Sequence, residues 1–233
     1  MIPGIVASAG RVAPQHFEPG HPHALKFDGA NDYVNITNSF GVFSGSQSFT
    51  LEAWVSVVSD PNHSVGNILS FGGEREVYLQ SKSLQSGNPG LQIFDGDGNN
   101  FVEHATNKDG DGWFHIAAVY DVENSDVYLY IDGDLSDNMG FLPSIDTRSD
   151  NSSIGHRSGF NRNHDGEIAD VRIWNAARSQ AVIQRDMNLR LTGDEPGLFA
   201  YWPIWEGEGD TVYDYSGNEN DGTLVGAPTW TTP

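Results

Sequence analysis

The sequence has no cysteine among its 233 residues. This absence excludes disulfide bonds, thiolate metal sites and cysteine nucleophiles, but it does not determine the compartment, because secreted proteins need not carry disulfides. Positive charge is also scarce. Twelve lysine and arginine residues face 32 aspartate and glutamate residues, which gives a net charge of 12 − 32 = −20. Such a surface repels phosphates, so nucleic acids and anionic membrane surfaces are not expected as partners.

Long apolar runs are missing as well. No segment approaches the roughly 20 apolar residues that a membrane-spanning helix needs, so membrane insertion is not expected. The first ten residues lack a positively charged start and a long apolar core, so they do not resemble a signal peptide. Three prolines follow before residue 24. We expect residues 1–23 to form an irregular lead-in or edge strand and residues 24–233 to form one domain.

Short apolar runs separated by glycine, asparagine and aspartate fill most of the chain. Residues 48–58 are the clearest strand, because apolar and polar side chains alternate along them. Residues 166–175 predict a late strand, and residues 223–225 predict a last short strand. One helix is expected over residues 179–191, between a serine N-cap and a following glycine. The sequence therefore predicts an all-β fold with one short helix.

An oxygen-rich turn interrupts residues 24–36, which otherwise have the pattern of two strand halves. Calcium prefers several hard oxygen ligands, and a turn that contains glycine can bring side-chain and backbone oxygens together. The late strand carries further carboxylates, and we expect it to be a spatial neighbour of this turn. The alternative is that the polar residues only stabilise a tight hairpin. The candidate calcium ligands are Asp28, Asn31, Asp32, Glu167 and Asp170.

Two places offer side chains that suit sugar recognition. Trp54 lies on the otherwise polar face of its strand, which indicates a groove or a covered face. The loop over residues 155–166 combines planar hydrogen-bond donors with an aromatic ring. The alternative for this loop is an ordinary solvated surface. The candidate ligand-binding residues are Trp54, His156, Arg157, Phe160 and Asn161.

Five segments together resemble a known family. They are residues 24–34, 49–55, 113–133, 166–178 and 198–218. Their order and spacing resemble those of the bacterial laminin G-like, or concanavalin A-like, modules, which are also pentraxin-like. The resemblance implies two antiparallel sheets packed as a jelly-roll sandwich. It also implies a structural calcium where the opening and late strands meet, and a role outside the cytoplasm. In one departure, Ala169 stands where relatives often carry an acidic residue.

No convincing catalytic set is present. Glucanases of this fold place acidic residues at alternating positions of one strand, and no strand here has that pattern. Glu206 and Glu208 are two apart, but they belong to a glycine-rich turn. The eight histidines show no zinc-binding spacing. Residues 95–99 begin like a calcium-binding EF-hand loop but lack its later glycine and glutamate. We therefore expect a protein that is not an enzyme.

The combined expectation is a calcium-stabilised, non-catalytic carbohydrate-binding module with a glycan as its partner. The resemblance places it in an extracellular or cell-surface bacterial protein, as one part of a larger multidomain chain. One alternative is a protein-interaction or spacer domain of an adhesin, whose partner would be a surface protein. A polysaccharide hydrolase or lyase is a third hypothesis. Fold alone does not choose among them.

Overall fold

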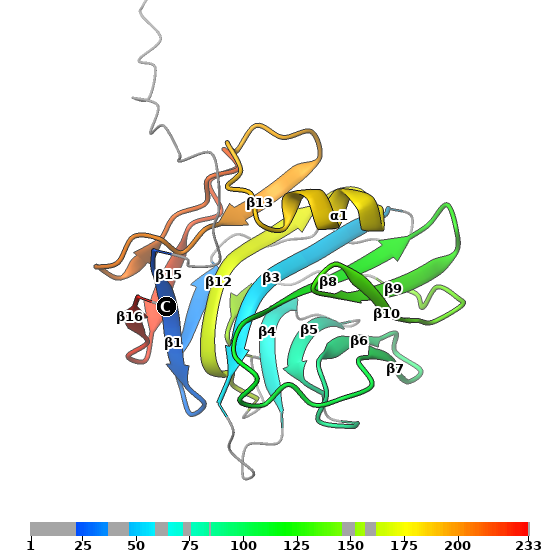
Figure 1. Ribbon diagram of the computed structural model, residues 1–233, viewed down its shortest axis with the longest axis horizontal. Coiled ribbons are helices and arrows are strands. Elements are labelled where there is room, and N and C mark those ends of the chain that lie inside the picture. The colour runs from blue at the N-terminus through cyan, green and yellow to red at the C-terminus, as the bar shows by residue number, and fades with distance from the viewer. Residues whose placement is uncertain are drawn as a thin grey trace, which may run out of the picture.

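Two antiparallel sheets form a sandwich in the computed structural model, which describes residues 22–36, 47–58, 65–71, 76–83, 85–145, 152–156 and 162–232 (Figure 1). Sheet A contains, in spatial order, β10 (Asp134–Asn138), β9 (Asp126–Ile131), β8 (Phe114–Asp121), β3 (Phe49–Val57), β12 (Asp165–Trp174), β1 (Ala24–Asp28) and β16 (Thr229–Thr231), with β13 (Leu198–Trp202) also beside β12. Sheet B contains β14 (Thr211–Val212), β15 (Gly222–Val225), β2 (Tyr33–Ile36), β11 (Ser152–Ile154), β4 (Gly66–Phe71), β5 (Glu76–Lys82), β6 (Gly90–Phe94) and β7 (Asn99–Glu103).

The hydrophobic core fills the space between the two sheets. In β3 the alternation predicted from the sequence puts Phe49, Leu51, Ala53, Val55 and Val57 into this core. The other long strands bury one apolar face in the same way, as expected for facing sheets. The all-β jelly-roll prediction is confirmed. Within the described ranges, no helix is long and apolar enough to cross a membrane.

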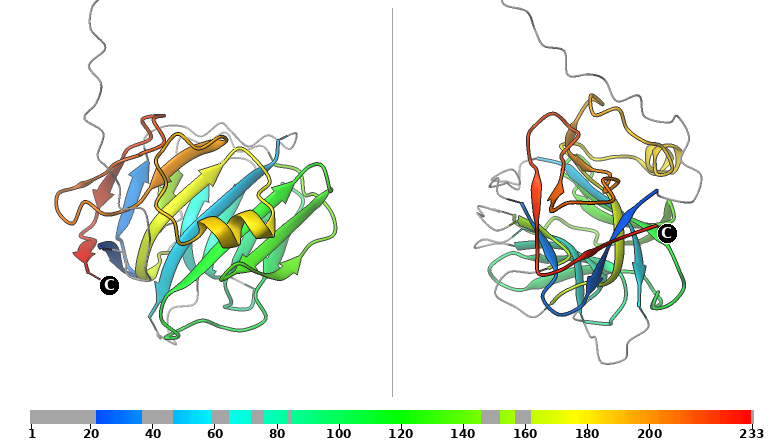
Figure 2. Two further views of the ribbon diagram at one scale, coloured as in Figure 1. Left: turned by 45° about the horizontal axis from the view of Figure 1, so that its top comes forward. Right: turned by 90° about the vertical axis from the view of Figure 1, so that its left-hand side faces the viewer.

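The helix α1 (Gln180–Asp186) lies outside the sandwich, on the outer face of sheet A (Figures 1 and 2). It begins where the sequence predicted but ends five residues before Leu191. Side chains from the sheet explain the early end. Arg172 donates to the carbonyls of Asp186 and Leu189, at 2.9 and 2.7 Å, and Trp54 donates to that of Met187, at 2.8 Å. These carbonyls are satisfied without a further helical turn.

Candidate functional site

The predicted turn residues lie between β1 and β2 and bind backbone groups. The Asp28 carboxylate accepts hydrogen bonds from the N–H groups of Ala30 and Asn31, at 2.9 and 3.4 Å. Asp32 is buried, and its two oxygens accept from the N–H groups of Asp28, at 3.2 Å, and Ala227, at 2.7 Å. The Asn31 side chain is exposed. These contacts hold the turn in shape and fasten it to the segment before β16.

The other two predicted calcium ligands lie elsewhere on β12. Asp28 stands opposite Asp165 in the register of β1 and β12, so Asp170 lies five residues further, roughly 15 Å away at the usual rise per residue. The guanidinium of Arg172 binds the Asp170 carboxylate at 2.5 and 2.9 Å. The Glu167 carboxylate instead accepts hydrogen bonds from the hydroxyls of Thr231 and Ser56. The five residues therefore do not form one ligand set, and no three described His, Asp or Glu side chains are grouped to hold a metal ion. Calcium binding stays a prediction.

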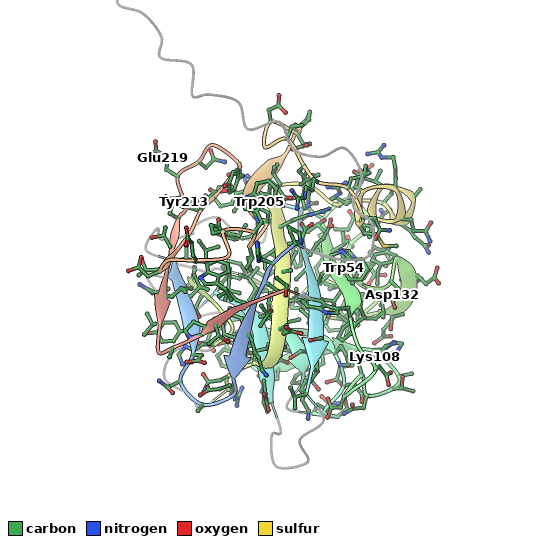
Figure 3. The ribbon with its side chains drawn as sticks, turned by 60° about the vertical axis from the view of Figure 1, so that its left-hand side comes forward. Trp54, Lys108, Asp132, Trp205, Tyr213 and Glu219 are labelled. Carbon is green, nitrogen blue, oxygen red and sulfur yellow. The ribbon has the colours of Figure 1, made fainter. Side chains whose placement is uncertain are left out.

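Trp54 and His156 are the described members of the predicted sugar contacts. The indole of Trp54 donates to the Met187 carbonyl and lies below α1, so this ring supports the helix (Figure 3). The His156 ring stacks on Tyr33, with centroids 4.7 Å apart. Both rings are committed to packing, and their role in sugar binding stays a prediction. Arg157, Phe160 and Asn161 lie outside the described residues.

A buried ion cluster lies under α1 on the outer face of sheet A. The carboxylate of Glu52 is fully buried and lies 3.5 Å from His115 Nε2, 3.7 Å from Arg172 Nη1 and 3.5 Å from Arg178 Nε. Burial raises the pKa of Glu52, but its interactions with His115 and the charges of the two arginines outweigh burial and hold the pKa below its ordinary value. Because the cluster is closed to solvent, we assign it to holding the helix on the sheet.

A bulge in β12 brings Asp170 into this cluster. The register between β12 and β3 shifts between Ala169 and Arg172, and Asp170 has a φ of 51°. Regular alternation after the core residue Ile168 would turn Asp170 toward the core, and the extra residue turns it instead to the outer face that Arg172 also faces. Asp170 therefore binds Arg172 in this structure, and its role as a calcium ligand stays a prediction.

A cavity of about 600 Å³ opens on the same outer face, where β1, β3, β12 and β16 lie side by side. Its volume falls within the range of small-molecule pockets, about 300–1,000 Å³. Its described walls combine charged, hydroxyl and aromatic side chains. The principal ones are His23, Lys26, Ser56, Glu167, Trp230 and Thr231.

Lys26 and Glu167 stand opposite each other in the strand register and line this cavity together. Glu167 Oε1 accepts the Thr231 hydroxyl at 2.7 Å, and Oε2 accepts the Ser56 hydroxyl at 3.3 Å. Lys26 is exposed and makes no hydrogen bond or ion pair with the described residues. The cavity therefore offers a free cation beside a carboxylate that its neighbours hold in place.

The loop after β13 contacts the imidazole of His23 and binds the indole of Trp230. Gly207 has a φ of 75°, and a Cβ at this position would lie 2.8 Å from His23 Nε2, so only glycine lets the loop approach the ring this closely. The Trp230 indole donates to the Gly209 carbonyl at 2.9 Å. Trp230 stands opposite the core residue Leu25 in the register of β16 and β1 and packs against the core, so its side chain faces the inner side of sheet A and not Lys26. Its ring therefore has a fixed orientation.

This arrangement suits a polyhydroxylated ligand. The carboxylate and the ammonium can hydrogen-bond hydroxyl groups. The sequence analysis identified Glu167 for a different role and missed Lys26, His23 and Trp230. The only local signal is that Lys26 lies on the polar side of its strand, between Leu25 and Phe27, which is too common a pattern to mark a site.

The family model Laminin_G_3, described as the concanavalin A-like lectin/glucanases superfamily, matches residues 28–184. The chain belongs to this family. The family expected from the five sequence segments is therefore confirmed. A search of curated proteins finds no match to this chain.

Solved structures similar to this superfamily member support the same fold. A Bacteroides ovatus protein described as a candidate carbohydrate-binding protein has a TM-score of 0.71 at 23% identity, covering 91% of this chain and 60% of its own. The heptameric SAP-like pentraxin of Limulus polyphemus has a TM-score of 0.56 at 12% identity, covering 91% and 95%. The carbohydrate-binding CBM40 domain of the Ruminococcus gnavus IT-sialidase, bound to α2,3-sialyllactose, has a TM-score of 0.53 at 14% identity, covering 68% and 92%. At these identities the likeness establishes the fold alone.

Proposed function

We propose that this protein is a non-catalytic carbohydrate-binding module and that the cavity lined by Lys26, Glu167 and Trp230 is its sugar site. The observation that carries the proposal is the meeting of an unpaired ammonium and a carboxylate fixed by two hydroxyl groups in one open cavity. The similarity in fold to the CBM40 domain supports it. We also propose an extracellular or cell-surface setting, with the module joined to a larger protein.

The physical chemistry of the cavity fits sugar recognition. Sugar hydroxyls need both donors and acceptors when they leave water. Glu167 supplies acceptor oxygens, and Lys26 and His23 supply donors. These donors and acceptors lie around one cavity.

The absence of catalysis is part of the proposal. Hydrolysis of a glycosidic bond commonly needs two carboxyl groups on either side of it, about 5 to 9.5 Å apart. Among the described residues lining the cavity, Glu167 is the sole carboxylate, and two hydroxyl groups already hold it. The cavity therefore supports binding and not bond cleavage.

A glycan array probed with the wild type and with Glu167→Ala tests the proposal. We expect wild-type binding to at least one glycan and a loss of affinity of about fivefold or more in the variant, which corresponds to about 1 kcal/mol for a lost hydrogen bond. Glu123→Ala is the matched control, because Glu123 is an exposed carboxylate that does not line the cavity. Its affinity should equal that of the wild type.

Two outcomes would contradict the proposal. A folded wild type that binds no glycan favours the protein-interaction or spacer role. Full binding by Glu167→Ala, with circular dichroism showing a native fold, would place the sugar site elsewhere on the module.

A further inference from the structure

We infer that the cavity selects a glycan that carries an isolated carboxylate, and that Lys26 binds this group. The inference rests on the proposed sugar-binding function and names the ligand class of that site. It starts from the surroundings of Lys26, which has no carboxylate partner among the described residues.

Cations are scarce in this chain, and most of those that the structure describes have a carboxylate partner within it. Twelve basic residues face 32 acidic ones, so a cation finds a carboxylate easily. The described cations with carboxylate partners within 4.0 Å are Lys82, Lys108, Arg172, Arg178 and Arg185. Lys26 makes no such pair with any described residue, and it lines a cavity. The Lys26 ammonium is therefore available to bind an anionic group of a ligand.

Glu167 does not cancel the charge of Lys26. The two residues are opposite in register, yet the Lys26 ammonium does not lie within 4.0 Å of the Glu167 carboxylate oxygens. The Glu167 oxygens instead accept the hydroxyls of Thr231 and Ser56. A sugar acid matches this arrangement, because its carboxylate can contact Lys26 while a neighbouring hydroxyl donates to Glu167.

The surrounding charge limits how anionic the ligand can be. A net charge of −20 repels polyanions, and one lysine cannot offset a densely charged chain. Glu167 adds a negative charge inside the cavity itself. These charges favour a glycan in which one acidic sugar stands among neutral ones. A polyuronate or a highly sulfated polysaccharide is disfavoured for the same reason.

Paired probes measure the contribution of the carboxylate. Isothermal titration calorimetry is run with oligosaccharides that carry a single glucuronic, galacturonic or sialic acid residue, each compared with its own carboxyl methyl ester. We expect at least one free acid to bind about tenfold more tightly than its ester. Raising NaCl from 50 to 500 mM should weaken binding of the acid and leave binding of the ester unchanged, because salt screens the ion pair.

The variant Lys26→Gln should remove this preference. It keeps a hydrogen-bonding side chain but no charge, so the acid should fall to the affinity of the ester and the ester should be unchanged. Lys108→Gln is the matched control, because Lys108 pairs with Asp111 and does not line the cavity. It should retain the tenfold preference.

Several results would overturn the inference. Equal wild-type affinity for an acid and its ester would refute carboxylate selection and leave the proposed function standing. Equal losses of affinity for the acid and for its ester in Lys26→Gln would show that Lys26 contacts the ligand without recognising its carboxylate. Tighter binding of a singly sulfated neutral oligosaccharide than of the acids would assign the site to sulfate. Binding of no probe and no array glycan would refute the proposed function as well.

Discussion

At the scale of single residues, Asp170 shows how a side chain with the chemistry of a ligand can be committed to structure. It is 2% exposed, and its carboxylate is bound by two nitrogens of Arg172. Burial alone lowers the pKa of Arg172, but the neighbouring Asp170 and Glu52 charges raise it, so the guanidinium stays charged. A buried pair of this kind is costly to break, because the remaining partner keeps its charge without compensation.

We therefore predict two separate results for Asp170→Asn. Unfolding in urea, followed by tryptophan fluorescence, should show a loss of about 3 kcal/mol in the free energy of unfolding. Any calcium affinity of the wild type, measured by calorimetry, should change by less than about twofold, since the carboxylate already serves Arg172. Asp97→Asn, at an exposed position, is the control and should alter neither quantity. A calcium affinity reduced tenfold would return Asp170 to the ligand set.

At the scale of elements, α1 depends on the sheet beneath it. A seven-residue helix is too short to be stable alone, because helix nucleation is unfavourable. Its C-terminal carbonyls are bound by Arg172 and Trp54, which project from β12 and β3. On its other side, Gln180 donates to the carbonyl of Gly133 in the turn between β9 and β10 at 3.0 Å. The helix therefore depends on the sandwich for its stability and is not an independent folding unit.

Trp54→Phe separates the structural role of this residue from its predicted role as a sugar platform. The substitution keeps an aromatic ring and removes the hydrogen bond to Met187. We expect a loss of about 1 kcal/mol in stability and faster hydrogen exchange in peptides that cover α1, measured by mass spectrometry. Glycan affinity should stay within about twofold of the wild type. A selective loss of glycan binding with unchanged exchange would restore the sequence-based assignment.

At the scale of the whole molecule, the two sheets are joined at one side by β7 and β10. The Asp137 carboxylate accepts from the Glu103 N–H at 3.1 Å, and His104 Nδ1 lies 2.8 Å from the Ser136 hydroxyl. Burial lowers the pKa of His104, and the charge of Lys108 adds to this effect against the opposing charge of Asp132. His104 is therefore neutral in the folded sandwich at neutral pH.

Acid should weaken the sandwich through this histidine. Its pKa in the unfolded chain is higher than in the folded state, so the unfolded chain binds the proton more readily. The stabilising contribution is complete above the ordinary histidine pKa of about 6.5 and is lost as the pH falls below it. Urea unfolding at pH 7.5 and 5.5 should show a larger loss of stability in the wild type than in His104→Gln. Equal losses in the two proteins would exclude His104 as the cause.

The sequence alone determined the architecture and the family, because alternation of apolar residues is a local property that each strand carries by itself. It did not determine which polar residues meet. Thr231 lies in β16, a strand that the sequence analysis missed, and it reaches Glu167 only because β16 pairs with β1 across most of the chain. The bulge at Asp170 and the close approach of Gly207 to His23 also depend on tertiary contacts. Strand register and loop packing between distant segments therefore decided the candidate site.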